Sequence, residues 1–228
     1  MNPLKKLIHH VVIALTRFFS RFLPDRSPLT IVGPGSSADL CLAIGQSGVT
    51  KCLIVTDSGL VELGMIERIS AALDRVGVAS VIYDGVEPDP TFIHVEAGLA
   101  KLREFDAQAV LAVGGGSPMD AAKLIAAMAT NDVPIRKLTG MFRVKNAPMP
   151  LYAIPTTAGT GSEVTIAAVV SDPTTHEKLF VIDPKLMPAM AALDASLMTG
   201  LPPHITAATG MDALTHAIES YLSSTSTD

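Results

Sequence analysis

The sequence predicts an α/β fold, a doubly wound, Rossmann-like parallel sheet. Short β-branched runs alternate repeatedly with longer amphipathic stretches between residues 29 and 128. These runs are almost continuously apolar, which is typical of parallel strands that are covered on both faces. With 228 residues, 48% of them hydrophobic, the chain can also bury a full core. Strand–helix units in succession therefore predict the doubly wound sheet.

Each expected element follows from its local pattern of apolar residues. Strands are expected over the short apolar runs 29–32, 52–56, 80–83, 109–113, 151–154, 165–171, 178–182 and 190–193. Helices are expected over the amphipathic stretches 37–46, 60–76, 92–105, 117–128 and from Pro203 onward. The runs at 165–171 and 178–182 surround the turn Asp172-Pro173-Thr174-Thr175, so we expect them to form a pair of strands.

The N-terminal segment differs from the rest of the chain. Apolar residues recur at helical spacing over 4–23, and basic side chains fill the opposite face up to Pro24. The longest apolar run, Val11–Leu15, is too short for a membrane span. Three interpretations remain for this amphipathic helix. It packs on the protein or on a partner subunit, it lies on an anionic membrane surface, or it is a targeting peptide.

The composition excludes several functions. The net charge is −5, aromatic residues make up 4% of the chain and tryptophan is absent, which argues against nucleic acid as a partner. Cys41 and Cys52 are too few for a disulfide scaffold or a zinc site. Two thiols in apolar surroundings are typical of a cytoplasmic protein with a reduced core.

Two features near the first strands suggest a nucleotide site. The turn Gly33-Pro34-Gly35-Ser36-Ser37-Ala38 matches the G-x-G-x-x-A fingerprint for dinucleotides. An ordinary strand-to-helix turn explains it as well, because Pro34 removes one amide that would hold a pyrophosphate. Asp57 ends the second strand, where a carboxylate can accept hydrogen bonds from a ribose 2′-hydroxyl.

A stronger candidate follows the strand at 109–113. The segment Gly114–Ser117 lets the backbone approach an anion closely, and Pro118 suits the first turn of the helix that follows. Free N–H groups at the start of that helix predict a phosphate site built from backbone dipoles. The alternative is a tight turn without a ligand. The motif is not a Walker loop, because Lys123 lacks the Gly-Lys-Ser/Thr context.

Two further segments carry polar side chains in suggestive patterns. Pro155–Thr165 combines threonines and a serine with glycines at the end of a strand, which suits hydrogen bonds to sugar and phosphate; a capping loop is the alternative. Asp212 and His216 are four residues apart on an expected helix and leave the same face. Such a pair can chelate one divalent metal, although a surface hydrogen bond explains it equally.

The three segments Gly114–Lys123, Pro155–Thr165 and Gly210–Glu219, in this order and spacing, resemble the iron-containing (group III) alcohol dehydrogenase family. The resemblance runs from about residue 29 to the C-terminus and is strongest to its lactaldehyde reductase and butanol dehydrogenase members. It implies a dinucleotide-binding α/β domain over residues 26–200, preceded by the basic helix of residues 1–25. Residues 201–228 then correspond to the first helix of an α-helical metal-binding domain.

The resemblance implies an oxidoreductase that interconverts a primary alcohol or diol and its aldehyde. It implies NAD as the cofactor, and Fe²⁺, or Zn²⁺ in some members, as a metal that polarises the substrate oxygen. Asp57 would meet the adenosine ribose and favour NAD over NADP, because a 2′-phosphate would face a like charge. The remaining cofactor-binding residues that it implies are Gly115, Gly116, Ser117, Thr156, Thr157, Thr160, Thr165 and Lys178.

Asp212 and His216 match the first two metal ligands of the family, which takes two further histidines from its α-helical domain. We therefore expect the 228-residue chain to be a truncated form, inactive by itself because two ligands hold a metal weakly. Family members are often homodimers. A glycerol or polyol dehydrogenase of the same fold and a non-catalytic nucleotide-binding fragment remain the alternatives. The expected location is cytoplasmic, and peripheral to the membrane if residues 4–23 bind lipid.

Overall fold

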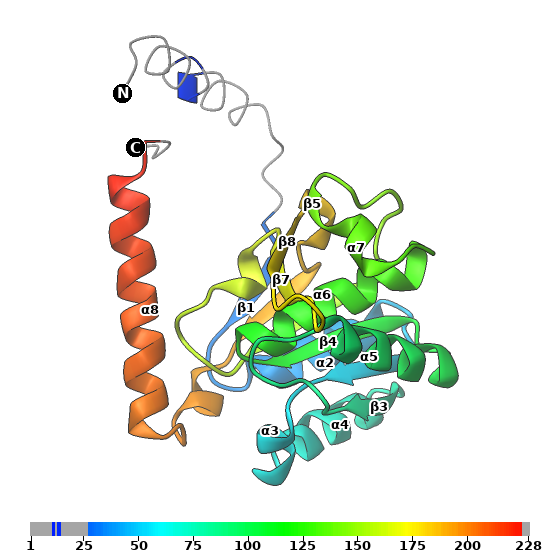
Figure 1. Ribbon diagram of the computed structural model, residues 1–228. Coiled ribbons are helices and arrows are strands. Elements are labelled where there is room, and N and C mark those ends of the chain that lie inside the picture. The colour runs from blue at the N-terminus through cyan, green and yellow to red at the C-terminus, as the bar shows by residue number, and fades with distance from the viewer. Residues whose placement is uncertain (1–10, 12, 15–26, 225–228) are drawn as a thin grey trace.

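The computed structural model describes residues 11, 13–14 and 27–224 (Figure 1). The predicted amphipathic helix over residues 4–23 lies almost entirely outside these residues and stays a prediction. Within the described part of the chain, none of the helices combines the length and the apolar character needed to cross a membrane.

A six-stranded sheet forms the centre of the molecule, in the order β1-β9-β6-β4-β2-β3. Every neighbouring pair in it is parallel, which confirms the predicted doubly wound architecture. The strands lie within a residue or two of the predicted ranges. They are β1 (Leu29–Val32), β2 (Lys51–Val55), β3 (Ala79–Tyr83), β4 (Ala109–Gly114), β6 (Leu151–Pro155) and β9 (Met190–Leu193).

The helices connect these strands as expected, with one correction. The helix predicted over 60–76 is two helices, because Gly64 adopts a left-handed φ of 67° between them. A short helix at Ile135–Leu138 was not predicted. The α-helices are α2 (Ser36–Gln46), α3 (Ser58–Glu62), α4 (Met65–Arg75), α5 (Phe92–Phe105), α6 (Gly116–Thr130), α7 (Ile135–Leu138) and α8 (Pro203–Leu222).

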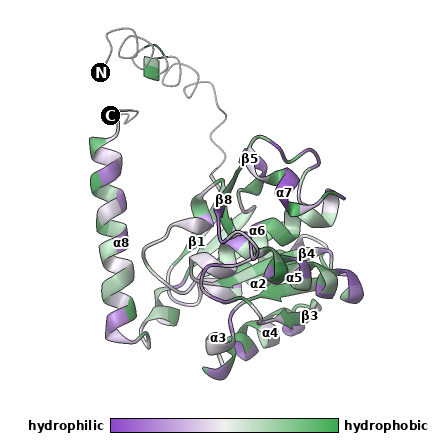
Figure 2. Ribbon diagram, viewed as in Figure 1, coloured by the Kyte–Doolittle hydropathy of each residue, from purple (hydrophilic) through white to green (hydrophobic). Residues whose placement is uncertain are grey.

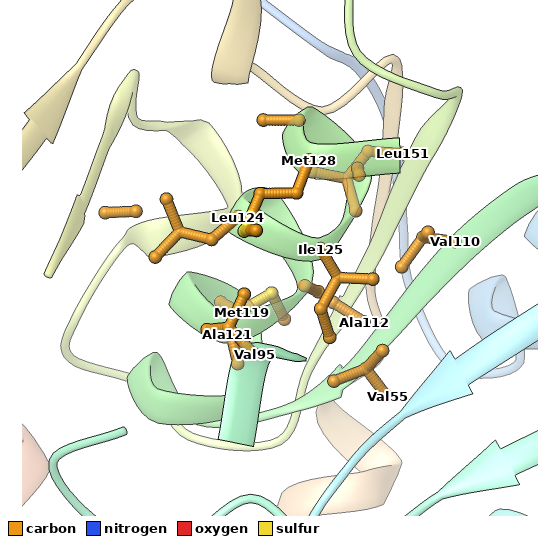
Figure 3. Packing of buried hydrophobic residues seen from close by; sticks show 14 of the residues in the cluster. Val55, Val95, Val110, Ala112, Met119, Ala121, Leu124, Ile125, Met128 and Leu151 are labelled. Carbon is orange, nitrogen blue, oxygen red and sulfur yellow. The ribbon is translucent and has the colours of Figure 1, made fainter. Parts of the chain in front are cut away.

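The sheet has an apolar core on each face. Helices α5 and α6 pack on one face, where Met119 and Ile125 of α6 point toward Val110 and Ala112 of β4 (Figure 3). Helices α2 and α4 cover the other face. All residues of β4 are buried, as its continuous apolar run predicts. The strands in this part of the sheet are accordingly green in Figure 2.

A second, three-stranded sheet packs beside α6, in the order β5-β8-β7. Its antiparallel pair β7 (Ala167–Ser171) and β8 (Lys178–Ile182) confirms the predicted pair of strands around the turn at Asp172. The first strand begins at Ala167 rather than at Thr165, because residues 162–164 form a short 3-10 helix that Thr165 terminates. Strand β5 (Gly140–Met141) was not predicted.

Helix α8 stands beside the α/β body (Figure 1). None of its residues is buried, and it is banded green and purple along its length (Figure 2). It approaches the body at Gly159, where an added Cβ would lie 2.4 Å from the carbonyl oxygen of Thr209. A residue with a side chain could not occupy position 159 without moving one of the two segments.

Candidate functional site

The strand order creates one place where a crevice is expected. The chain leaves β2 for β3 on one side, and β4 then lies on the other side of β2. Loops that leave the carboxyl ends of two such strands diverge, and ligands of doubly wound sheets bind between them. Asp57 follows β2 and Gly115 follows β4, so both stand at this switch point.

A cavity of about 490 Å³ opens at this position. Its walls come from the end of β2, the loop after β3, the loop after β4, the loop after β6 and the segment that leads into α8. The lining residues are Asp57, Ser58, Gly59, Leu60, Leu63, Val86, Glu87, Pro88, Gly115, Gly116, Ser117, Pro118, Thr156, Thr157, Leu201, Pro202 and Ile205. The cavity thus brings together six residues that the sequence interpretation predicts to bind a cofactor: Asp57, Gly115, Gly116, Ser117, Thr156 and Thr157.

The glycine turn depends on the absence of side chains. Gly114 has a φ of +151°, and a Cβ there would lie 2.6 Å from Cγ of Pro118. A Cβ on Gly116 would lie 3.1 Å from Cγ2 of Thr160, and one on Gly115 would lie 3.4 Å from Thr157. Because these glycines carry no side chains, the backbone at the start of α6 lies directly at the cavity. The first N–H groups of a helix have no partner within the helix and favour a negative charge.

The side chain of Thr157 lacks a hydrogen-bond partner within the described part of the chain. Among the residues that the structure describes, its buried Oγ1 makes no hydrogen bond, and neither does Oγ1 of Thr56 at the end of β2. A buried hydroxyl without a partner costs about 1–3 kcal/mol, so a ligand is a natural explanation for one that lines a cavity. The turn of Gly114, Gly115 and Gly116 forms a glycine cradle at the start of α6. This cradle and the Thr157 hydroxyl both fit a bound dinucleotide.

Asp57 is held in place by the start of α3. Its Oδ1 accepts a hydrogen bond of 3.1 Å from the amide of Leu60. The carboxylate is partly buried at the cavity wall, across the switch point from Gly115. This is the position in which a carboxylate can receive the hydroxyls of a ribose.

The turn after β1 has a different role. The amides of Gly35 and Ser37 and the hydroxyl of Ser37 donate to one oxygen of Asp194, at 3.1, 3.3 and 2.6 Å. A carboxylate of the protein thus occupies the place that a phosphate would take at this helix start. Strand β1 also lies at the edge of the sheet, away from the switch point. These contacts favour the structural interpretation of the Gly33–Ala38 motif.

Three predicted cofactor residues do not line the cavity. Lys178 forms an ion pair with Asp89 at 2.6 Å, and both side chains are exposed. Thr160 lies behind Gly116, and its Oγ1 accepts a hydrogen bond from the amide of Ser162. Thr165 accepts a hydrogen bond of 2.9 Å from Nζ of Lys123.

Lys123 does not line the cavity but holds Ser162 and Thr165 of the loop beside it, a role that the sequence interpretation missed. Its side chain is 1% exposed, and its ammonium group donates to Oγ of Ser162, Oγ1 of Thr165 and the carbonyl of Ala167 at 3.0, 2.9 and 2.7 Å. Burial lowers its pKa to about 8, although the nearby Asp120 opposes this change. The sequence feature that could have indicated a buried lysine is its position within the apolar run of α6, three residues after Asp120.

Asp212 and His216 lie on α8 as predicted. Their closest atoms, Oδ1 and Nε2, are 3.7 Å apart, and the side chains are 42% and 55% exposed. Within residues 27–224 no third histidine, cysteine or acidic side chain joins them to form a possible metal site. A catalytic metal takes three or more protein ligands, so this pair fits part of such a site and does not complete it.

Comparison with known proteins places this geometry in a family. The family model of iron-containing alcohol dehydrogenases matches residues 28–195. The chain belongs to the iron-containing alcohol dehydrogenase family. Lactaldehyde reductase of Escherichia coli is 42% identical over 192 residues, which cover 83% of this chain and 50% of that enzyme.

Solved structures of this family have the same fold. The structure of a 1,3-propanediol oxidoreductase matches with a TM-score of 0.84 and 37% identity, over 86% of this chain and 52% of the other. A sulfoacetaldehyde reductase from Bifidobacterium kashiwanohense in complex with NAD⁺ matches with a TM-score of 0.78 and 32% identity, again over 86% and 52%. The chain spans about half the length of each of these relatives.

Proposed function

We propose that this chain holds NAD in the cavity at the switch point and serves the interconversion of a primary alcohol or diol and its aldehyde. The observation that carries the proposal is the cavity itself, where the glycine cradle of β4–α6 faces Asp57 and the unpartnered hydroxyl of Thr157. The relatives support the chemistry, since they include a lactaldehyde reductase, a 1,3-propanediol oxidoreductase and a sulfoacetaldehyde reductase that was solved in complex with NAD⁺.

The residues of the cavity have distinct roles in this proposal. Gly115, Gly116 and Ser117 bring the start of α6 to the pyrophosphate, where backbone N–H groups and the helix dipole balance its charge. Asp57 accepts hydrogen bonds from the adenosine ribose and repels a 2′-phosphate, so NAD is preferred over NADP. Thr156 and Thr157 supply hydroxyls to the nicotinamide half.

Three of the predicted cofactor residues do not line the cavity: Thr160, Thr165 and Lys178. Thr160 supports Gly116 through its methyl group, and Thr165 is anchored by Lys123. Lys178 reaches a nicotinamide ribose only if it leaves Asp89. When bound, the nicotinamide ring supplies the hydride acceptor for alcohol oxidation, and the protein supplies its position and field.

We also propose that the 228-residue chain by itself binds the cofactor but does not turn over an alcohol. Asp212 and His216 give two ligands for Fe²⁺ or Zn²⁺, which hold a metal weakly. The chain would then behave as a nucleotide-binding fragment, one of the alternatives from the sequence. Polyol oxidation remains the second candidate chemistry, because the 1,3-propanediol oxidoreductase shares the fold.

The test is to measure NADH binding by fluorescence, Fe²⁺ binding by calorimetry and NAD-linked oxidation of 1,3-propanediol with the purified chain. We expect saturable NADH binding, weak metal binding and no turnover. Gly116→Val should abolish NADH binding because its side chain meets Thr160, whereas Gly200→Val, at a position with no atom within 4 Å of an added Cβ, should not. Robust turnover would refute the proposed inactivity, and absence of NADH binding would refute the site.

Three further proposals rest on the sequence pattern and on the family. We propose a cytoplasmic location, because Cys41 and Cys52 are both buried and free.

We propose that a complete protein of this kind is a homodimer. We propose that residues 4–23 pack on the protein or on a partner subunit, or lie on an anionic membrane surface, and liposome binding before and after deletion of residues 1–24 would test the membrane interpretation.

A further inference from the structure

A second cavity, of about 560 Å³, opens at the C-terminal end of α6. It is lined by the segment that follows α6, by α7 and by the loop after β5, on the side of the molecule away from α8 (Figure 1). Helix α6 has 15 residues, so roughly 20 Å of helix separates this cavity from the glycine cradle. The two cavities share no lining residue. A ligand of the second cavity would therefore not compete with a dinucleotide at the switch point.

The loop that forms one wall of this cavity is held in place by two buried polar side chains. Asn131, which follows α6, is 5% exposed, and its Oδ1 accepts the amides of Lys145 and Asn146 at 3.1 and 2.9 Å. Asp183 is 1% exposed, and its Oδ2 accepts the amide of Val144 at 3.1 Å. Three successive amides of the loop are thus fixed from two directions. The wall is built before any ligand arrives, as is usual for small-molecule sites.

One side of the cavity is apolar and carries an exposed aromatic ring. Val133, Pro134 and Leu138 contribute apolar atoms, and the side chain of Phe142 lines the cavity although it is 65% exposed. Phe142 also has a φ of +57°, an uncommon backbone conformation for a bulky residue, and its amide donates to the carbonyl of Ile182 at 2.8 Å. Such outliers gather at ligand sites. A ring held in this way at a cavity wall suits a second planar ring.

The other side of the cavity is positively charged. Lys137, Arg143 and Lys145 line it, against Asp132 as the one acidic lining residue. Between residues 27 and 224, no ion pair engages any of the three cations. The guanidinium of Arg143 lies over Gly140, where an added Cβ would come 3.1 Å from its Nε. Cations without partners at a cavity favour an anion, and a guanidinium matches a carboxylate or phosphate in shape.

We propose that this second cavity binds a small aromatic anion, that is, a planar apolar ring system that carries one carboxylate or phosphate group. The ring system lies against Phe142 and the apolar wall, and the anionic group meets Arg143 and Lys145. Neither wall explains the other: an apolar ligand needs no cations, and a bare anion needs no aromatic ring. The site is independent of the proposed function, because it shares no residue with the cavity at the switch point.

The test is calorimetric titration of the full chain with matched probes, in saturating NAD⁺ so that the switch point is occupied. The probes are 2-naphthoate, 2-naphthyl phosphate, the neutral 2-naphthamide and inorganic phosphate. We expect one saturable site for 2-naphthoate or 2-naphthyl phosphate, and the tighter of the two identifies the anionic group. The neutral amide and inorganic phosphate should each bind at least about 10-fold more weakly, because each meets only one of the two walls.

Variants locate the binding. Arg143→Gln combined with Lys145→Gln should weaken the naphthyl anions about 10-fold and leave 2-naphthamide unchanged. The matched control is Arg68→Gln combined with Arg75→Gln, which removes two exposed charges from α4, outside the cavity, and should change nothing. Phe142→Gly, which keeps the left-handed φ available, should weaken anions and amide alike by about 5-fold.

The outcomes are distinct. If the double variant at the cavity does not fold, Lys137→Gln alone should weaken the naphthyl anions about 3-fold. Absence of saturable binding to the folded chain would overturn the inference. So would equal affinities for the anions and the amide, equal affinities for the naphthyl anions and inorganic phosphate, or equal losses in the cavity variant and the α4 control.

Discussion

At the scale of single residues, the cavity depends on a few positions that no other residue type could fill. Gly114 combines a left-handed φ with close contact to Pro118, so any side chain there is strained and obstructed. The triple glycine could therefore be recognised from the sequence. Lys123 could not, because whether a lysine in a helix is solvated or buried depends on packing that the local sequence does not reveal.

The charge of Asp57 yields a prediction about cofactor choice. Replacing it with Asn should leave a hydrogen-bonding side chain at the cavity wall but remove the repulsion of a 2′-phosphate. The preference for NADH over NADPH should fall by about 10-fold or more, mainly through tighter NADPH binding. Fluorescence titration with both cofactors measures this ratio. An unchanged ratio would show that Asp57 does not face the adenosine ribose.

Asp194 yields a prediction about pH and stability. Burial opposes its ionisation, but hydrogen bonds from Ser196, Ser37 and Gly35 outweigh this and lower its pKa to about 2. A folded-state pKa below the unfolded value stabilises the protein by about 2 kcal/mol above pH 4, and this contribution is lost as the pH falls toward 2. Asp194→Asn should therefore lower the free energy of unfolding by about that amount at pH 7.

Urea unfolding of both proteins between pH 7 and pH 2 measures this difference. The gap between wild type and Asp194→Asn should narrow below about pH 4. Titration of other carboxylates affects both proteins equally and cancels in the comparison. A gap that stays constant with pH would contradict the assigned role of the Asp194 charge.

At the scale of elements, local patterns predicted most strands and helices, because apolar runs report burial directly. They did not predict the break at Gly64, where a glycine within an amphipathic stretch is compatible with a helix until its φ is known. Nor did they predict that β1 pairs with β9, since these strands are far apart in the sequence and no local signal joins them. The same limit applies to the contact between Gly159 and α8.

That contact predicts how α8 responds to substitution. Gly159→Ala places a methyl group against the carbonyl of Thr209, so α8 should move and lose about 1–3 kcal/mol of local stability. Gly210 follows Thr209 on α8 itself. In Gly210→Ala the new methyl group meets no atom within 4 Å, and the substitution should stabilise the helix by about 0.5–1 kcal/mol. Amide hydrogen exchange within α8 measures both effects. Equal exchange in the two variants would contradict the close approach.

At the scale of the whole molecule, the parallel sheet sets where chemistry can occur. The order of the strands places the switch point between β2 and β4, and segments from distant parts of the sequence meet there. The sequence motifs predicted which loops would meet at this cavity, but not that Thr165 and Lys178 would be engaged by Lys123 and Asp89. Those contacts are tertiary and have no signature in residue spacing.

Amide hydrogen exchange with and without NADH would show directly whether a dinucleotide binds at this switch point. We expect saturating NADH to slow amide exchange in residues 114–119 and 156–162. We expect no change in residues 33–38, where Asp194 already occupies the helix start. Protection of residues 33–38 with none at 114–119 would show that the dinucleotide does not bind at the switch point.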